Sequence, residues 1–148
     1  KESIRAIMEA DYIIYGCGSL YTSVIPNLII PEIRAAIRRC KAKKIYFCNV
    51  MTQPGETDGY SVEDHVDAIL DHSDNLDAID AVIMRSDDLY EKTLQRYLEQ
   101  DSTPVLLKEE EHSYKVWKRE ILKFDSGLIR HDSLKLKTVF EEILNEEW

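Results

Sequence analysis

The sequence predicts an α/β fold built around a mainly parallel β-sheet. Two short runs rich in β-branched and aromatic residues, Tyr12 to Tyr15 and Ile45 to Cys48, are predicted strands. Around them lie segments whose apolar residues recur at helical spacing. The second run is apolar throughout, which is typical of a parallel strand covered on both faces. Strands that alternate with helices in this way favour a parallel sheet with helices packed against it.

The first fifty residues are expected to form helix, strand, helix and strand in turn. A helix over 3–10 has its apolar side chains on one face and precedes the strand over 12–15. After a glycine-rich turn, a helix over 31–40 begins with Pro31, a residue that suits the first turn of a helix. The strand over 45–48 completes this part of the chain.

Three later segments carry strand signals. Residues 79–84 form a third predicted strand, and residues 104–107 a fourth, short one. The mixed stretch that follows allows strand at 116–117 and again at 120–124.

Capping residues mark the starts of the later helices. Ser61 is expected to cap a helix with Asp64 three residues on, in a variant of the capping box. Asp87 or Asp88 is expected to cap the next helix, and Ser133 the last one.

Composition places the chain among soluble globular proteins. Its 148 residues are 44% hydrophobic and 32% charged, and no apolar run approaches the roughly 20 residues of a membrane helix. A net charge of −9 argues against non-specific binding to nucleic acid. Three cysteines without a CxxC pair indicate reduced thiols in a cytoplasmic protein. The chain opens without a signal peptide. It also opens without Met, which is compatible with a part of a longer protein.

The segment from Gly16 to Ser23 is the first candidate ligand site. It comes directly off a strand, and its two glycines permit a tight turn and close approach of a ligand to the backbone. Ser19 and Thr22 add hydroxyl groups, and residues 1–50 carry a net charge of +4, so a phosphate or diphosphate suits the segment. The alternative is a structural glycine turn with a capping serine, since neither a P-loop nor a complete dinucleotide fingerprint is present.

The polar loop over residues 49–60 is the second candidate. Ligands of parallel sheets bind outside the carboxyl ends of the strands, where such loops converge. Glu56 and Asp58 can hold a hydrated metal ion or a ribose. Three further side chains can hydrogen-bond sugar hydroxyls or a base edge: Asn49, Thr52 and Gln53. The alternative is a loop closed on itself by Asx and glycine turns.

Histidine and arginine side chains supply further candidates. His65 beside Asp64 allows acid–base chemistry near neutral pH, although a hydrogen-bonded packing residue is the more common role of such a histidine. His112 lies in a charged run and is expected to be solvated. Arg130 can clamp a phosphate through its guanidinium group or pair with one of the many acids. Ser133 is interpreted as a helix cap, with a modifiable hydroxyl as the alternative.

Three blocks of sequence resemble the YvcK-type gluconeogenesis-factor family of the CofD-like superfamily. They are GCGSLYTSVIPNLIIPEIRAAI at 16–37, KKIYFCNVMTQPGETDGYSVEDHVDAI at 43–69 and IRHDS at 129–133. Cys17 stands where the family usually has proline, and the family's GGGTG loop is absent from this chain. Residues 1–148 therefore resemble the C-terminal part of a single CofD-like domain whose N-terminal half is missing.

The resemblance implies a Rossmann-like, three-layer αβα fold and a cytoplasmic bacterial protein that binds UDP-N-acetylglucosamine. The implied role is regulatory and links carbon metabolism and gluconeogenic growth to cell-wall synthesis and cell shape, with no catalytic or metal-binding residue assigned. Ser133 falls where relatives carry a phosphorylatable threonine, so a kinase is a candidate partner. The resemblance places these residues at the ligand cleft: Gly16, Gly18, Ser19, Tyr21, Thr22, Asn49, Thr52, Gly55, Glu56, Thr57, Asp58, Gly59, Tyr60 and Arg130.

Two other functions stay open at this stage. CofD relatives transfer a phospholactyl group from a nucleotide diphosphate to a deazaflavin alcohol, a reaction that needs Mg²⁺ on the diphosphate. Glu56, Asp58 and Asp64 are the candidate carboxylates for it. The other alternative is a structural domain that acts through protein partners, including copies of itself in a homo-oligomer. A UDP-sugar and an NAD-like dinucleotide are not distinguished, because both present a diphosphate.

Overall fold

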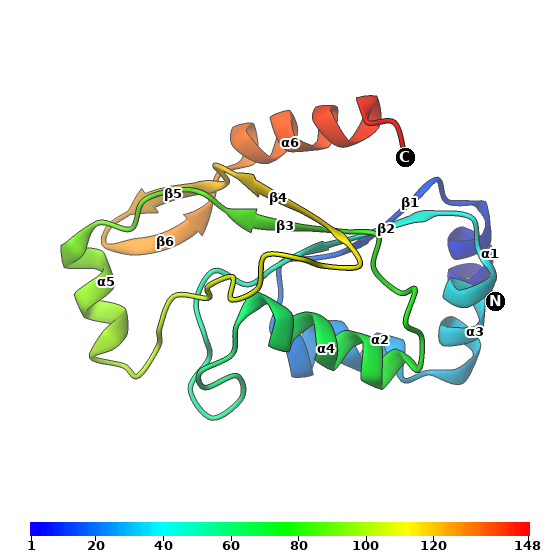
Figure 1. Ribbon diagram of the computed structural model, residues 1–148, viewed down its shortest axis with the longest axis horizontal. Helices are drawn as coiled ribbons and strands as arrows, with labels where there is room; N and C mark the ends of the chain where they lie inside the picture. Colours follow the sequence, from blue (N-terminus) through cyan, green and yellow to red (C-terminus); the bar gives the residue numbers. More distant parts are fainter.

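Four parallel strands form the central sheet of the protein (Figure 1). The computed structural model describes residues 1–148, and the strands follow the order β1-β2-β3-β4. Because all of them run the same way, their carboxyl ends meet at one edge, so the prediction of a mainly parallel sheet is confirmed. Their bounds are β1 Tyr12–Tyr15, β2 Lys43–Phe47, β3 Ala81–Arg85 and β4 Lys115–Arg119.

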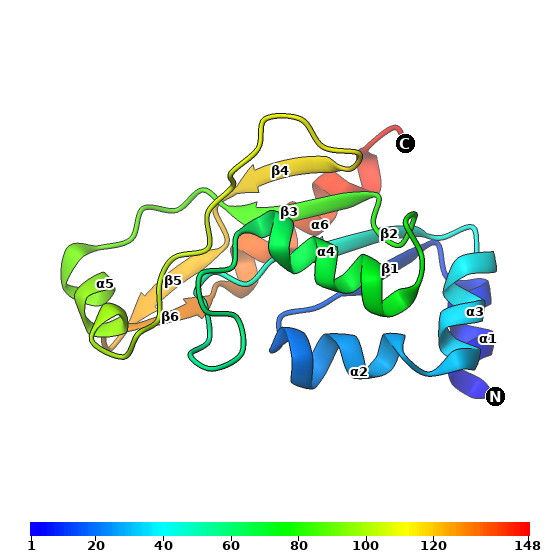
Figure 2. The same ribbon diagram turned by 60° about the horizontal axis from the view of Figure 1, so that its bottom comes forward.

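Helices cover both faces of the sheet. The helical segments are α1 Glu2–Glu9, η1 Leu20–Val24, α2 Ile25–Leu28, α3 Pro31–Arg39, α4 Val62–Ser73, α5 Glu91–Leu98 and α6 Ser133–Asn145. In Figures 1 and 2, α2 and α4 lie on one face of the sheet and α6 lies on the other. This is the predicted three-layer αβα arrangement. A separate antiparallel hairpin, β5 Leu122–Asp125 and β6 Leu128–His131, extends beyond the end of β3.

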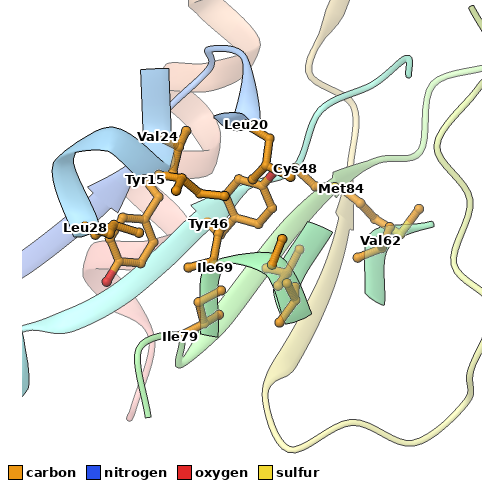
Figure 3. Packing of buried hydrophobic residues seen from close by; sticks show 14 of the residues in the cluster. Tyr15, Leu20, Val24, Leu28, Tyr46, Cys48, Val62, Ile69, Ile79 and Met84 are labelled. Carbon is orange, nitrogen blue, oxygen red and sulfur yellow. The ribbon is translucent and has the colours of Figure 1, made fainter. Parts of the chain in front are cut away.

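The sheet separates two apolar clusters. On the α4 face, Tyr46 packs with Ile69 and Leu20 (Figure 3), and Val82 belongs to the same cluster. All four side chains are fully buried. On the α6 face, Ile45 and Ile83 pack with Val139 and Ile143. Neighbouring residues of one strand point to opposite faces, so β2 and β3 contribute to both clusters. Each fully buried aliphatic side chain stabilises the fold by about 1.5 to 3 kcal/mol.

The nine residues after Ser19 form helical turns that the sequence analysis did not predict. η1 is a π-helical turn of five residues, and α2 continues it directly. Their four buried members, Leu20, Val24, Ile25 and Leu28, belong to the cluster on the α4 face. Burial of this apolar stripe against the sheet, rather than a local capping signal, accounts for the helix.

The predicted strand over 104–107 is wrong. Pro104 makes one isolated bridge to Met51, and the backbone of this segment bonds to two different elements. The N–H of Val105 donates to the carbonyl of Val50 at 2.9 Å, and the N–H of Val62 donates to the carbonyl of Leu106 at 2.9 Å. The segment therefore ties the loop after β2 to the start of α4.

The capping box at the start of α4 is confirmed, but the helix start after β3 differs from the prediction. Ser61 and Asp64 exchange hydrogen bonds of 2.8 and 3.1 Å between side chain and backbone. Neither Asp87 nor Asp88 caps α5, whose N-cap is Tyr90 without a side-chain bond.

Asp87 instead joins three elements. Its buried carboxylate accepts hydrogen bonds from the N–H groups of Ile121 at 2.7 Å and Leu122 at 3.2 Å, at the start of β5. It also accepts one from the Lys135 ammonium on α6 at 2.9 Å. Burial by itself would raise the pKa of the Asp87 carboxyl, but these bonds outweigh burial and lower it.

The cap of α6 lies one residue earlier than predicted. Asp132 is the N-cap, and its side chain accepts hydrogen bonds from the N–H groups of Leu134 at 2.8 Å and Lys135 at 3.2 Å. Ser133 is the first helical residue, and it is exposed. An Asp carboxylate caps a helix at least as well as a serine hydroxyl, which accounts for the shift.

The expectation that His112 is solvated is wrong. Its side chain is 6% exposed, and its Nε2 lies 3.0 Å from Glu63 Oε1. The same carboxylate accepts hydrogen bonds from the N–H groups of Lys108 and Glu109 at 3.0 and 2.9 Å. Burial by itself would raise the pKa of the Glu63 carboxyl, but the bonds from His112 and the backbone lower it from 4.5 to about 2.

Two tryptophans, one on β4 and one at residue 148, lie together. The rings of Trp117 on β4 and Trp148 have centroids 5.6 Å apart. Lys115 Nζ lies 5.1 Å from the centroid of the Trp148 ring, which is a cation–π contact. None of the helices is long and apolar enough to cross a membrane.

Replacement of Asp87 by alanine is expected to destabilise the fold by about 2 to 4 kcal/mol, because two buried N–H groups lose their acceptor. The neighbouring variant Asp88→Ala changes an exposed carboxylate and is expected to stay within about 0.5 kcal/mol of the unmodified chain. Urea unfolding at neutral pH measures both. Equal losses of stability in the two variants would contradict the role assigned to Asp87.

The Glu63 carboxylate is expected to make the stability depend on acid pH. Its pKa is lower in the folded chain than in the unfolded chain, so its contribution is complete above pH 4.5 and disappears as the pH falls toward about 2. The free energies of unfolding of the unmodified chain and of Glu63→Gln are therefore expected to converge over this interval. A control variant at an exposed carboxylate, Glu111→Gln, is expected to keep a constant difference. A pH-independent difference for Glu63→Gln would refute the assignment.

Candidate functional site

A cavity of about 360 Å³ lies beyond the carboxyl ends of β1 and β2. The turn after β1 contributes Gly18 and Ser19, and the loop after β2 contributes Asn49. β6 contributes Arg130 from the opposite side. The cavity therefore brings together predicted residues from three separate sequence blocks. Its position agrees with the rule that ligands of parallel sheets bind at this edge.

The turn after β1 is shaped by Gly18. The N–H of Gly18 donates to the carbonyl of Gly16 at 3.0 Å, and the carbonyl of Ser19 accepts hydrogen bonds from Ser23 and Val24 at 2.9 and 3.2 Å. A Cβ atom on Gly18 would lie 2.7 Å from the Cβ of Ser23, whereas one on Gly16 would meet nothing within 4 Å. Close packing of the turn against the following helix thus requires glycine only at position 18.

Side-chain bonds hold the loop after β2 against this turn. The Asn49 amide accepts a hydrogen bond from the Tyr46 hydroxyl at 2.8 Å and donates one to the carbonyl of Gly18 at 3.1 Å. The Gln53 amide donates to the Ser19 hydroxyl at 2.8 Å, while its Oε1 is buried without a partner. Both loops that the sequence singled out therefore form one connected wall of the cavity.

A pair of tyrosines makes a further link between the same two loops. The hydroxyl oxygens of Tyr21 and Tyr60 lie 2.7 Å apart, and this hydrogen bond raises the pKa of Tyr21 to about 12. The two rings meet edge to face, as do the rings of Tyr60 and His65. Tyr21 and Tyr60 do not line the cavity, but their hydrogen bond joins the two segments that contribute to its wall.

The remaining predicted residues of the loop bond mainly to one another. The hydroxyl of Thr57 accepts a hydrogen bond from the N–H of Gln53 at 2.8 Å, and Asp58 accepts one from the N–H of Gly55 at 2.7 Å. The Thr52 hydroxyl accepts a hydrogen bond from the N–H of Thr103 at 2.8 Å, and the hydroxyl oxygens of these two threonines lie 3.1 Å apart. The predicted site residues outside the cavity lining are Gly16, Tyr21, Thr22, Thr52, Gly55, Glu56, Thr57, Asp58, Gly59 and Tyr60. Their contacts with a ligand stay predictions.

The hairpin places Arg130 at the far wall of the cavity. Arg130 is exposed and pairs in register with Lys123 of β5, so two cationic residues are neighbours on the hairpin. The N–H of Ile129 donates to the hydroxyl of Tyr97 on α5 at 3.1 Å, which fixes the hairpin to that helix. The guanidinium group is thus available at the mouth of the cavity for an anionic ligand.

Sequence reasoning missed other lining residues, among them Tyr97 and His131. His131 adjoins Arg130 in the IRHDS block, but Tyr97 lies in an amphipathic helix and carries no local signal of a site. Burial lowers the pKa of His131, which favours the neutral imidazole. Partial burial also raises the pKa of the Cys17 thiol, which disfavours the thiolate.

His65 is a buried packing residue rather than an exposed acid–base group. Its Nδ1 lies 2.7 Å from the carbonyl of Ser61, and its ring is fully buried under Tyr60. Burial lowers the pKa of His65, which favours the neutral ring. Asp64 is occupied in the capping box with Ser61.

The family model described as 2-phospho-L-lactate transferase CofD matches residues 1–122. A gluconeogenesis factor of Bacillus subtilis is 39% identical over 148 residues, covering 98% of this chain and 46% of that protein. A putative gluconeogenesis factor of Nostoc is 46% identical over 141 residues, covering 93% of this chain and 31% of that protein.

A crystal structure of a Bacillus halodurans protein has the same fold. It superposes with a TM-score of 0.88 at 36% identity, covering 97% of this chain and 46% of that one. The chain thus spans less than half the length of the relatives it matches. It belongs to the CofD family and, within that family, to the gluconeogenesis factors.

Proposed function

We propose that this chain forms part of a binding site for a nucleotide sugar, UDP-N-acetylglucosamine, in a regulatory protein that does not turn its ligand over. The observation that supports the proposal is the meeting of Gly18, Asn49 and Arg130 around one cavity. A guanidinium group can bind a diphosphate through two oxygens at once. The backbone of a glycine turn and an amide side chain supply the neutral polar groups that a sugar or a base requires.

The cavity has the size and lining of a small-molecule site. Its volume of about 360 Å³ lies within the range of roughly 300 to 1,000 Å³ that is usual for such sites. Tyr97 offers an aromatic surface, and the neutral imidazole of His131 offers a polar one, to a flat base or a sugar ring. Neither group repels the negative charge of a diphosphate.

The proposal also includes a regulatory role for the whole protein of which this chain is a part. The name of the Bacillus subtilis relative connects that protein with gluconeogenesis. Binding of a cell-wall precursor by a cytoplasmic protein of this family would link carbon metabolism to cell-wall synthesis and cell shape. Phosphorylation of the exposed Ser133 hydroxyl, one residue after the cap of α6, is a further part of the same proposal.

A transferase is the second candidate function, favoured by the description of the matching family model. Transfer of a phosphorus-containing group would need Mg²⁺ near the diphosphate. Of the carboxylates named for this role, Asp58 bonds to the N–H of Gly55 and Asp64 bonds to Ser61, and neither lines the cavity. This arrangement favours the binding protein over the transferase.

Arg130→Ala is expected to weaken UDP-N-acetylglucosamine binding by roughly 10- to 100-fold, because a charge-assisted bond to the diphosphate is lost. Calorimetric titration of the chain with UDP-N-acetylglucosamine, and with NAD for comparison, measures the effect. Arg5→Ala removes the same group from an exposed position on α1 and is expected to bind as the unmodified chain does. Equal weakening by both variants would exclude a specific role for Arg130.

Chromatography of the recovered ligand separates the two functions. Unchanged UDP-N-acetylglucosamine, together with no transfer of a phospholactyl group from its nucleotide diphosphate to the deazaflavin alcohol in the presence of Mg²⁺, supports the regulator. Transfer of a phosphorus-containing group to the alcohol would establish the transferase. Preference for NAD in the titration would reject the nucleotide sugar as the ligand.

Gly18→Ala is expected to weaken ligand binding and to destabilise the fold by about 1 to 3 kcal/mol, since the new Cβ would overlap the Cβ of Ser23 at 2.7 Å. Gly16→Ala is a matched control in the same turn, because its Cβ meets no atom within 4 Å. Thermal unfolding and titration of both variants measure the two effects. If Gly16→Ala is as damaging as Gly18→Ala, close packing at position 18 is not what shapes the turn.

A further inference from the structure

The two walls of the cavity belong to different parts of the fold. One wall is the loop after β2, which contributes Asn49 and Gln53 and follows the central sheet directly. The other wall is the hairpin, which contributes Ile129 and Arg130 and extends beyond the sheet (Figure 1). The position of the Arg130 guanidinium group relative to the first wall therefore depends on what holds the hairpin in place.

The hairpin is anchored to the rest of the protein at its base. The Asp87 carboxylate accepts hydrogen bonds from the N–H groups of Ile121 and Leu122, and the N–H of Asp132 donates to the carbonyl of Ile121 at 2.9 Å. β5 and β6 pair only with each other, so no strand of the central sheet supports the remainder of the hairpin. There the hairpin lies beside α5 (Figures 1 and 2).

The N–H of Ile129 on β6 faces α5. β5 ends at Asp125 and β6 begins at Leu128, so a two-residue turn joins them and this pair exchanges hydrogen bonds. Bonded and open pairs alternate along an antiparallel ladder, so the next pair, Phe124 and Ile129, directs its backbone groups outward. The N–H of Ile129 donates to the Tyr97 hydroxyl at 3.1 Å, which is the one hydrogen bond between α5 and β6.

The backbone of the same tyrosine is linked to the opposite wall. α5 ends at Leu98, so the carbonyl of Tyr97 has no acceptor role within the helix. It accepts hydrogen bonds from the N–H groups of Gln100 and Ser102, each at 3.0 Å. The buried Ser102 hydroxyl donates to the carbonyl of Thr52 in the loop after β2 at 2.6 Å. Tyr97 thus connects both walls of the cavity.

We infer that Tyr97 is a positioning residue, which sets the place of Arg130 relative to the loop after β2 and thereby the affinity of the site for a diphosphate. The inference rests on the proposed function, because it takes a diphosphate as the ligand of Arg130. The Tyr97 hydroxyl acts through the backbone of Ile129, whereas the Tyr97 ring lines the cavity itself. A guanidinium group that binds two oxygens at once requires the correct distance and angle, so a small displacement of β6 weakens the contact.

This link also gives a role to two buried residues outside the cavity lining, Thr52 and Ser102. They are 3% and 6% exposed, and they bond to each other and to α5 rather than to a ligand. Walls that are held together in this way before the ligand arrives lose less entropy when it binds.

Hydrogen exchange without a ligand tests the contact itself. Tyr97→Phe removes the hydroxyl and keeps the ring, so the Ile129 amide is expected to exchange at least about tenfold faster. Tyr90→Phe is a matched control, because Tyr90 adjoins the other end of α5, is 65% exposed and makes no hydrogen bond through its hydroxyl. In this control the Ile129 amide is expected to exchange as in the unmodified chain.

Calorimetric titration with UDP-N-acetylglucosamine tests the consequence for the site. Tyr97→Phe is expected to raise the dissociation constant about 3- to 10-fold, and Tyr90→Phe to leave it unchanged. In the Arg130→Ala background, Tyr97→Phe is expected to change it by less than about twofold, because the group that Tyr97 positions is gone. A merely structural role would weaken binding equally in both backgrounds.

A second variant breaks the other end of the link. Ser102→Ala removes the hydrogen bond to the carbonyl of Thr52 and is expected to weaken binding in the unmodified background but not in the Arg130→Ala background. Inorganic pyrophosphate, a diphosphate without a base or a sugar, serves as a second probe in the same titrations.

Three outcomes would overturn the inference. They are unchanged exchange of the Ile129 amide in Tyr97→Phe, unchanged affinity of that variant, and an equal loss of affinity with and without Arg130. Failure of the proposed function gives a different result, in which the unmodified chain binds pyrophosphate through Arg130 but not UDP-N-acetylglucosamine. Absence of binding to both probes would overturn the proposed function and the inference together.

Discussion

The parallel alignment of β1 and β2 is the constraint on which the candidate site depends. It brings the turn after Tyr15 and the loop after Phe47 to the same edge of the sheet, although more than thirty residues separate them. Asn49 then joins the two through the Tyr46 hydroxyl and the carbonyl of Gly18. Without this alignment, neither the amide bridge nor the tyrosine pair could form, and the cavity would lose one of its walls.

The loop after β2 illustrates how a polar segment can be both self-contained and functional. Its threonines and Asp58 satisfy backbone groups of the loop or of its neighbours, so they fix its shape without facing the cavity. Asn49 and Gln53 line the cavity and bond to the turn after β1, so they hold the loop against that turn. The two interpretations of the loop, as a closed turn or as a ligand wall, are therefore compatible. A wall that is ordered in advance loses less entropy when a ligand binds.

Local signals in the sequence predicted much of the fold, whereas contacts distant in sequence decided the rest. β1, β2 and the Ser61 capping box depend on neighbouring residues and were predicted closely. Asp87 resembles a helix cap locally, but its acceptor role depends on Ile121 and Lys135, which lie far along the chain. The side chain of His112 is covered where it meets Glu63 of α4, which lies far away in the sequence. At the site, Arg130 was anticipated from its sequence block, but Tyr97 was not, because only the fold brings α5 to the hairpin.

The paired tryptophans have a spectroscopic consequence. Trp117 and Trp148 are the only two tryptophans of the chain, and they lie against each other beside Lys115, away from the lining of the cavity. The intrinsic fluorescence of the protein therefore reports on the packing of its C-terminal segment against β4. A ligand that enters the cavity without disturbing this segment leaves the emission unchanged, whereas separation of the last residues from the sheet exposes the indole rings to water and alters it.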